Sequence, residues 1–152
     1  MQLTLYTDYS LRVLLYLGLK KERATIDEIA KAFRISRAHL VKVVHALSRR
    51  GYVHSARGPG GGLELAKAPE KVRIGRFVYE TEARFDIVEC FDPERNTCPI
   101  AGVCRLEEIL RDAKTAFLSS LDRYTLADLI ESPRGKDPRR PLLGLELPRV
   151  PK

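Results

Sequence analysis

Apolar residues recur every three or four positions in three successive segments, which is the spacing of an amphipathic helix. The first segment runs from about residue 3 to residue 18. The second begins at the capping-box pattern Thr25-Ile26-Asp27-Glu28, and the third follows Ser36, a favoured N-cap residue. Gly51 then occupies the position where a left-handed residue commonly ends a helix. The three apolar stripes are Leu11, Leu14, Leu15 and Gly18; Ile26, Ile29, Ala30 and Phe33; and Leu40, Val43, Val44 and Leu47.

After Gly51 the pattern changes to short extended runs. Residues 52–57 and 63–66 are predicted strands on either side of a glycine-rich turn at 58–62, so they are expected to pair as a hairpin. Three helices followed by a hairpin is the order of a winged helix-turn-helix, in which the hairpin is the wing. The sequence therefore predicts a winged helix-turn-helix domain over residues 1–76.

The rest of the chain is also predicted to be mostly helical. A helix is expected over 74–81, a loop over 90–104, a long helix from Arg105 to about Leu121, and a short helix over 126–130 capped by Thr125. The fold class is thus mostly α, with a β-hairpin wing, a long dimerisation helix and a cysteine-bearing loop. Residues 77–131 form the second predicted unit. The long helix has Leu106, Ile109, Leu110, Ala113 and Phe117 along one side.

Charge divides the chain at nearly the same boundaries. Residues 1–76 carry 15 basic and 6 acidic side chains, whereas residues 77–132 carry 6 basic and 12 acidic ones. The last twenty residues have a net charge of +4 and hold five of the nine prolines. This composition predicts that residues 132–152 form a poorly ordered basic tail that adds non-specific attraction to phosphate.

Several classes of protein are excluded by what the sequence lacks. It has no apolar run long enough for a membrane helix and no secretory signal, so a cytoplasmic protein without membrane contact is expected. Three cysteines do not make a disulfide framework. No nucleophile-base arrangement, paired-carboxylate motif or cofactor loop indicates an enzyme. A glycine-rich loop without the Lys-Ser/Thr of a Walker motif does not indicate a nucleotide site.

The basic half suggests double-stranded DNA as a partner. The helix after Ser36 is the candidate recognition helix, because such a helix places its N-terminal residues against base edges in the major groove. A glycine-rich wing lets the backbone approach phosphates closely. The competing interpretation is a solvated basic face on an unrelated helical domain. The candidate DNA-binding residues are Ser36, Arg37, Ala38, His39, Lys42, His45 and Arg49 on the helix, and Arg57, Gly58, Gly60 and Gly61 in the wing.

All three cysteines, Cys90, Cys98 and Cys104, lie within fifteen residues of one another. Four interpretations stay open: three structural thiols, redox-active thiols, a zinc site that lacks a fourth ligand, and an iron–sulfur cluster that also needs a fourth ligand. The cluster is favoured, because thiolates are its usual ligands and a Pro/Asp/Asn-rich loop is a poor place to bury thiols.

The combination of these features resembles the IscR/NsrR/RirA family of bacterial regulators, most closely its nitric-oxide-sensing repressors. The likeness covers about residues 1–131 and is carried by Met1-Gln2-Leu3-Thr4, Thr7-Asp8-Tyr9, Leu40-Val41-Lys42-Val43, Gly51-Tyr52-Val53, Arg57-Gly58, Gly61-Gly62 and residues 124–129. It implies a homodimer that binds a palindromic operator. In each subunit the three cysteines would hold one 4Fe-4S cluster, with Asp8 of the other subunit as fourth ligand.

The resemblance also distinguishes a two-iron from a four-iron cluster at this site. A two-iron cluster would want a histidine three residues after the last cysteine, where this chain has Glu107. Asp8 has an independent explanation, since an acid in the first turn of a helix is favourable with the helix dipole. The expected function is a transcriptional repressor that releases DNA when nitric oxide nitrosylates or removes the cluster. The alternatives are a regulator of the same family that responds to iron or cluster status, and a cluster carrier.

Overall fold

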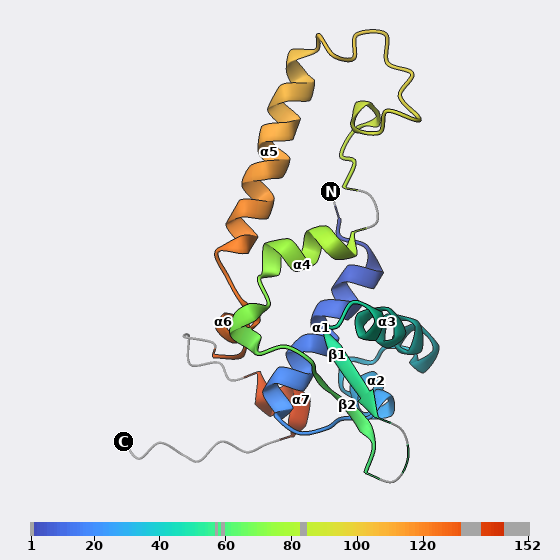
Figure 1. The fold of residues 1–152 in the computed structure, drawn as a ribbon, viewed down its shortest axis with the longest axis vertical. Coiled ribbons are helices and arrows are strands. Elements are labelled where there is room, and N and C mark those ends of the chain that lie inside the picture. Colours follow the sequence, from blue (N-terminus) through green and yellow to red (C-terminus); the bar gives the residue numbers. More distant parts are fainter. Residues whose placement is uncertain (1, 57, 59, 83–84, 132–137, 145–152) are drawn as a thin grey trace.

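The computed structural model describes residues 2–56, 58, 60–82, 85–131 and 138–144. The molecule is elongated, with a helical body and hairpin at one end and a long helix with its adjoining loop projecting at the other (Figure 1). The mostly helical fold class with one antiparallel hairpin is confirmed. Within those ranges, no helix combines the length and apolar character of a membrane span.

The first three helices form where the sequence predicts them, and each begins at a side-chain cap. They are α1 (Leu5–Lys20), α2 (Ile26–Phe33) and α3 (Arg37–Arg49). The capping box is reciprocal: Glu28 N donates to Thr25 Oγ1 at 3.2 Å and Thr25 N donates to Glu28 Oε2 at 2.6 Å. The first helix starts two residues later than predicted, because the Thr4 hydroxyl caps it by accepting from Thr7 N.

The predicted hairpin is present as β1 (Val53–Ala56) and β2 (Gly62–Leu65). The strands are antiparallel, with Val53 opposite Leu65 and Ala56 opposite Gly62. Ala24, in the turn between α1 and α2, pairs with Leu63 through two backbone hydrogen bonds of 3.0 and 2.8 Å. The base of the wing is therefore fastened to the helical body.

One hydrophobic core joins both halves of the sequence. It includes Leu14, Leu40 and Leu47 from α1 and α3, all fully buried, together with Phe77 and Leu126. Phe77 belongs to α4 (Ile74–Thr81), which follows a short 3-10 helix, η1 (Pro69–Lys71); Leu126 opens α6 (Leu126–Ile130). The core thus continues across the boundary that the sequence suggested at residue 76.

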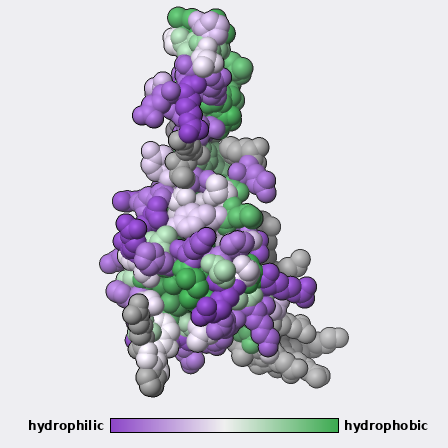
Figure 2. All heavy atoms as spheres, turned by 90° about the vertical axis from the view of Figure 1, so that its right-hand side faces the viewer, coloured by the Kyte–Doolittle hydropathy of each residue, from purple (hydrophilic) through white to green (hydrophobic). Residues whose placement is uncertain are grey.

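The long helix α5 (Arg105–Asp122) reaches this core near its C-terminal end, through Leu118 and Leu121. None of its 18 residues is fully buried, and Leu106 and Ile109 are 58% and 51% exposed. Figure 2 shows hydrophobic side chains gathered along one edge of the projecting end of the molecule. Only the C-terminal end of α5 packs on the body, against α4. There the Asp122 carboxylate accepts from Arg76 N at 3.0 Å.

The C-terminal segment differs from the prediction over part of its length. Residues 139–143 were expected to be poorly ordered, but they form a short helix, α7 (Arg139–Leu143). Leu143 packs against the hydrophobic core, and Leu142 lines a recess with Tyr16 and Ala32. Apolar burial against α1 and α2 explains this order. The other residues of the predicted tail, 132–137 and 145–152, lie outside the described ranges.

Candidate nucleic-acid interface and cysteine loop

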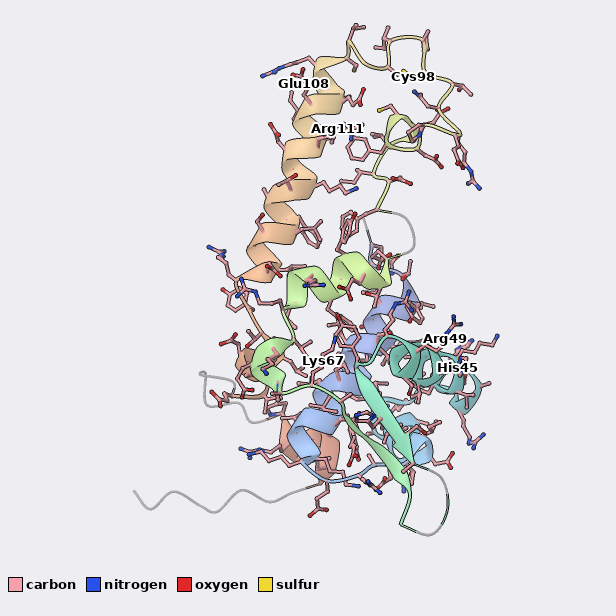
Figure 3. The ribbon with its side chains drawn as sticks, viewed as in Figure 1. His45, Arg49, Lys67, Cys98, Glu108 and Arg111 are labelled. Atoms are coloured by element: carbon pink, nitrogen blue, oxygen red, sulfur yellow. The ribbon has the colours of Figure 1, made fainter. Side chains whose placement is uncertain are left out.

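The outer face of α3 is exposed, rich in basic side chains and free of acidic residues. Leu40, Val43, Val44 and Leu47 face the core with at most 5% exposure, whereas Ala46 and Ser48 are half-buried at its edge. The exposed predicted DNA-binding residues on this face are Ser36, Arg37, Ala38, His39, Lys42, His45 and Arg49. Figure 3 shows that His45 and Arg49 both project away from the body. A convex basic helix of this kind can enter a major groove.

Two of these residues also contact neighbouring helices. The His39 ring lies against Tyr9 of α1, with ring centroids 6.2 Å apart, and its backbone N–H donates to the Ser36 hydroxyl at 3.3 Å. Arg37 forms a 2.9 Å ion pair with Asp27 of α2. Both partners of that pair are well exposed, so it is weak and Arg37 can exchange it for another anion.

The wing is positioned by an arginine from outside the hairpin. The Arg23 guanidinium donates to the Glu64 carboxylate through Nε at 3.0 Å and Nη2 at 3.3 Å, and to the Gly60 carbonyl at 3.2 Å. This pairing lowers the pKa of Glu64 and raises that of Arg23. The three bonds fix the glycine turn relative to α1. Gly58, Gly60 and Gly61 lie in that turn, whereas Arg57 lies outside the described residues.

Hydrogen bonds within the cysteine loop fix its backbone. Cys90 lies on η2 (Glu89–Phe91), and Cys104 is the residue before α5. The Asn96 side chain accepts from Cys98 N at 3.0 Å, and Glu89 accepts from both the backbone N–H and the hydroxyl of Thr97 at 2.7 Å. All three cysteines are free thiols of intermediate exposure.

Aromatic contacts hold the loop against α5. The Phe91 ring has the Arg111 guanidinium 4.7 Å and the Lys114 ammonium 5.4 Å from its centroid. Lys114 also lies over Phe85, which packs against Phe117 with centroids 5.9 Å apart. The residue next to Cys90 is thus fastened to the long helix by cation–π contacts.

Burial and the acidic groups around it affect the Cys90 thiol. Desolvation raises the pKa of the Cys90 thiol, and the charges of Glu107, Cys98 and Cys104 raise it further. Glu107 accepts from Arg111 and from Gly102 N, which together lower its pKa. The donor chemistry, three free thiols in one loop, fits a thiolate-bound iron–sulfur cluster. Among the described residues no group of three His, Cys, Asp or Glu side chains is already arranged as a metal site.

Asp8, the fourth predicted ligand, lies on the first turn of α1 and is paired within its own chain. Its carboxylate accepts from Arg12 Nε at 3.0 Å and forms a 2.7 Å ion pair with Arg12 Nη2. The first-turn position fits the helix-dipole explanation, and a metal ion ligated by Asp8 would share the carboxylate with Arg12 or displace it. In Figure 3, Cys98 lies at the projecting end of the molecule, whereas His45 and Arg49 lie on the helical body, so the structure does not bring Cys98 and α3 together within one chain.

Sequence reasoning missed two residues of the candidate DNA-binding region, one beside the wing and one on α3. Arg23 was not singled out, because its partners Glu64 and Gly60 are about forty residues away and no local pattern signals the pairing. Val41 was not assigned to the exposed face, although the helical spacing leaves it outside the Leu40, Val43, Val44 stripe.

Comparison with known proteins finds a matching family model, similar sequences and a similar structure. Residues 3–132 match the Rrf2 family model, described as iron-dependent transcriptional regulator. The HTH-type transcriptional regulator NsrR of Bacillus subtilis is 48% identical over 87% of this chain and 92% of its own length, and that of Geobacillus kaustophilus is 50% identical over 86% and 90%. A putative transcriptional regulator from Listeria innocua has a similar structure, with a TM-score of 0.69, 26% identity and 90% of each chain covered.

Proposed function

Because this chain belongs to the Rrf2 family of transcriptional regulators, we propose that it is a homodimeric, DNA-binding repressor that senses nitric oxide through an iron–sulfur cluster. The observation that carries the proposal is the pairing, in one chain, of an exposed basic helix with a loop that holds three free thiols. The chain is also similar to regulators named NsrR over nearly their whole length, which supports the same proposed function. As a regulator of this family, the chain is not an enzyme.

The DNA-binding part of the proposal assigns α3 to the major groove and the wing to the flanking phosphates. The net charge of +9 over residues 1–76 supplies the attraction to the phosphate backbone. The exposed residues of α3 would meet base edges, while Gly58, Gly60 and Gly61 allow the backbone of the wing to approach phosphate.

The cysteine loop would hold the cofactor. Cys90, Cys98 and Cys104 provide three soft thiolate ligands, and we assign the fourth position of a 4Fe-4S cluster to Asp8 of the other subunit. A carboxylate is a hard ligand among soft thiolates, so the iron held by Asp8 would be the one most open to reaction with nitric oxide. When bound, the cluster supplies iron with which nitric oxide reacts. Arg111 and Lys114 lie over Phe91, the residue after Cys90, and so hold this part of the loop against α5.

A second copy of the chain would cover the apolar side of α5. An amphipathic helix of 18 residues with exposed Leu106 and Ile109 leaves an apolar stripe in water, which is unfavourable unless another surface covers it. Pairing α5 with its symmetry mate would bury this stripe and set two α3 helices at a fixed separation. A two-fold dimer of this kind matches a palindromic operator.

Helix α4 connects the cysteine region to the DNA-binding elements. Its N-terminal end packs on α5 through Asp122, and its C-terminal end meets α1, where the Thr7 hydroxyl donates to that of Thr81 at 3.1 Å. Glu80 in between accepts from Tyr52 at the start of the wing at 2.6 Å. A shift of α5 would therefore reach both α1 and the wing through one short helix.

The proposal is tested by preparing the protein without air and measuring iron, sulfide, mass and DNA binding before and after nitric oxide. We expect about four irons and four sulfides per chain, as a cubane cluster requires. The mass should be that of two 17.2 kDa chains, and nitric oxide should release DNA. Release by iron depletion but not by low nitric oxide would favour an iron-responsive regulator, which the family description also suggests. Stoichiometric zinc without iron would contradict the sensing mechanism.

Replacing Arg23 with alanine should weaken DNA binding about three- to tenfold, because a wing that is no longer held must be ordered on binding. The dependence of affinity on salt should stay unchanged, since the Arg23 guanidinium is occupied by Glu64 and Gly60 rather than by phosphate. Fluorescence anisotropy at several salt concentrations measures both quantities.

The matched control for this variant is the exchanged pair Arg23→Glu with Glu64→Arg, which restores the ion pair at the same net charge. It should recover most of the affinity. If the Arg23→Ala variant binds as tightly as the parent protein, the pair does not position the wing. If its salt slope instead falls by about 0.9, Arg23 contacts a phosphate directly.

A further inference from the structure

Val41 is a branched apolar side chain on the exposed face of α3. It is 41% exposed, whereas its neighbours Leu40 and Val43 are 0% and 3% exposed. Arg37 lies one turn before it and His45 one turn after it, and both are exposed. Val41 therefore lies among the residues that would face DNA and contributes little to the core.

Val41 lies outside the hydrophobic core, and 41% of its surface is exposed in the folded chain. The small recess of about 170 Å³ beside α3 is lined by Leu5, Tyr6, Tyr9, His39, Lys42 and Val43, without Val41. Its side chain therefore remains available to whatever α3 contacts.

The chemistry of the major groove restricts what an apolar side chain can recognise there. Each base edge presents hydrogen-bond donors or acceptors, and the one apolar group in the groove is the 5-methyl of thymine. Valine has no donor or acceptor of its own. Placed against cytosine or adenine it would cover a polar edge without pairing it, which is unfavourable.

From this arrangement we propose that Val41 is a specificity-determining residue that reads the methyl group of one thymine in each half-site of the operator. The inference rests on the proposed DNA-binding function and adds a base identity to it. Ala38 is another methyl-bearing residue on this face, but its side chain is the shorter of the two. The branched Val41 side chain offers the larger apolar surface to a thymine methyl.

The test compares thymine with deoxyuridine, which differs only in lacking the methyl group. A binding site is first selected from random DNA with the full-length, anaerobically prepared protein. Each thymine of that site is then replaced singly by dU, and affinities are measured for the parent protein and for Val41→Ala. At one thymine per half-site we expect the parent to lose about three- to fivefold in affinity, the effect of one buried methyl group. The Val41→Ala protein should show no such loss there.

Two controls make the result specific. Lys42→Ala removes the adjacent exposed side chain but leaves Val41 in place, so it should weaken binding and keep the dU effect. Alanine favours helix over valine, so Val41→Ala should not unfold α3, which circular dichroism checks. Two outcomes would overturn the inference: a dU effect that persists at every thymine in the Val41→Ala protein, and a binding site at which no dU replacement weakens the parent protein. Failure to enrich any sequence would instead contradict the DNA-binding function itself.

Discussion

Replacing Cys98 with serine should leave the anaerobically purified protein with less than about a tenth of its iron and sulfide, because clusters of this class depend on thiolate ligands. A serine hydroxyl is a hard oxygen donor that stays protonated near neutral pH, so it does not substitute for a soft thiolate. The DNA affinity of the variant should match that of the nitric-oxide-treated parent. That difference should be about 5- to 150-fold, the range of typical couplings between sites.

The fold of the loop should survive this substitution. Its backbone is fixed by the Asn96 and Glu89 side chains rather than by the Cys98 sulfur, and serine is nearly the same size as cysteine. Val103→Ala is the matched control, since Val103 lies next to Cys104 and is 85% exposed, and the variant keeps all three thiols; it should retain its iron. Iron and sulfide assays with DNA binding before and after nitric oxide measure these effects. A Cys98→Ser protein with full iron content would rule out the ligand assignment.

The local elements of the DNA-binding half could be predicted from sequence because their signals are local. Thr25 and Glu28 lie within one helical turn, and their reciprocal hydrogen bonds form as the capping-box pattern predicts. Ser36 caps α3 in the same way, and Gly51 follows that helix with φ of +68°. Each of these features depends on residues at most four positions apart, so no knowledge of the tertiary fold is needed.

Features that depend on distant partners could not be predicted in this way. The order of α7 depends on apolar surface that α1 and α2 provide, more than a hundred residues earlier. The Arg23–Glu64 pair joins the turn after α1 to strand β2, and these segments meet only in the folded chain. The cysteine spacing indicates a ligand set, but a site shared between subunits is not assembled in one chain. The cluster, the dimer and the role of Asp8 therefore stay predictions.

The contact between α4 and α5 predicts a second large effect, at Gly75. Backbone and side-chain atoms of α5 lie against the α-carbon of this glycine: a Cβ atom would come within 2.6 Å of Asp122 N and Asp122 Cβ, and closer still to the Leu118 carbonyl oxygen. Two of these three are backbone atoms, so a rotamer change cannot relieve the clash. Gly75→Ala must push the two helices apart.

We expect Gly75→Ala to destabilise the protein by about 1–3 kcal/mol, the usual cost of forcing extra atoms into a packed contact. For a chain of this size that lowers Tm by roughly 3–10 °C. Displacement of α5 should also weaken the hydrogen bond from Arg76 N of α4 to the Asp122 carboxylate of α5. Because α4 is the connection to α1 and the wing, nitric oxide should then change DNA affinity less than in the parent protein, even at full iron content.

Thermal unfolding by circular dichroism and DNA binding with and without nitric oxide measure the two parts of this prediction separately. Tyr79→Ala is the matched control, because Tyr79 lies on the same helix with its side chain 60% exposed; it should change Tm by at most about 2 °C. A Gly75→Ala protein that melts with the parent would show that α4 and α5 can separate at no cost. One that melts lower but keeps the full response to nitric oxide would exclude this helix contact as the route from the cysteine loop to DNA.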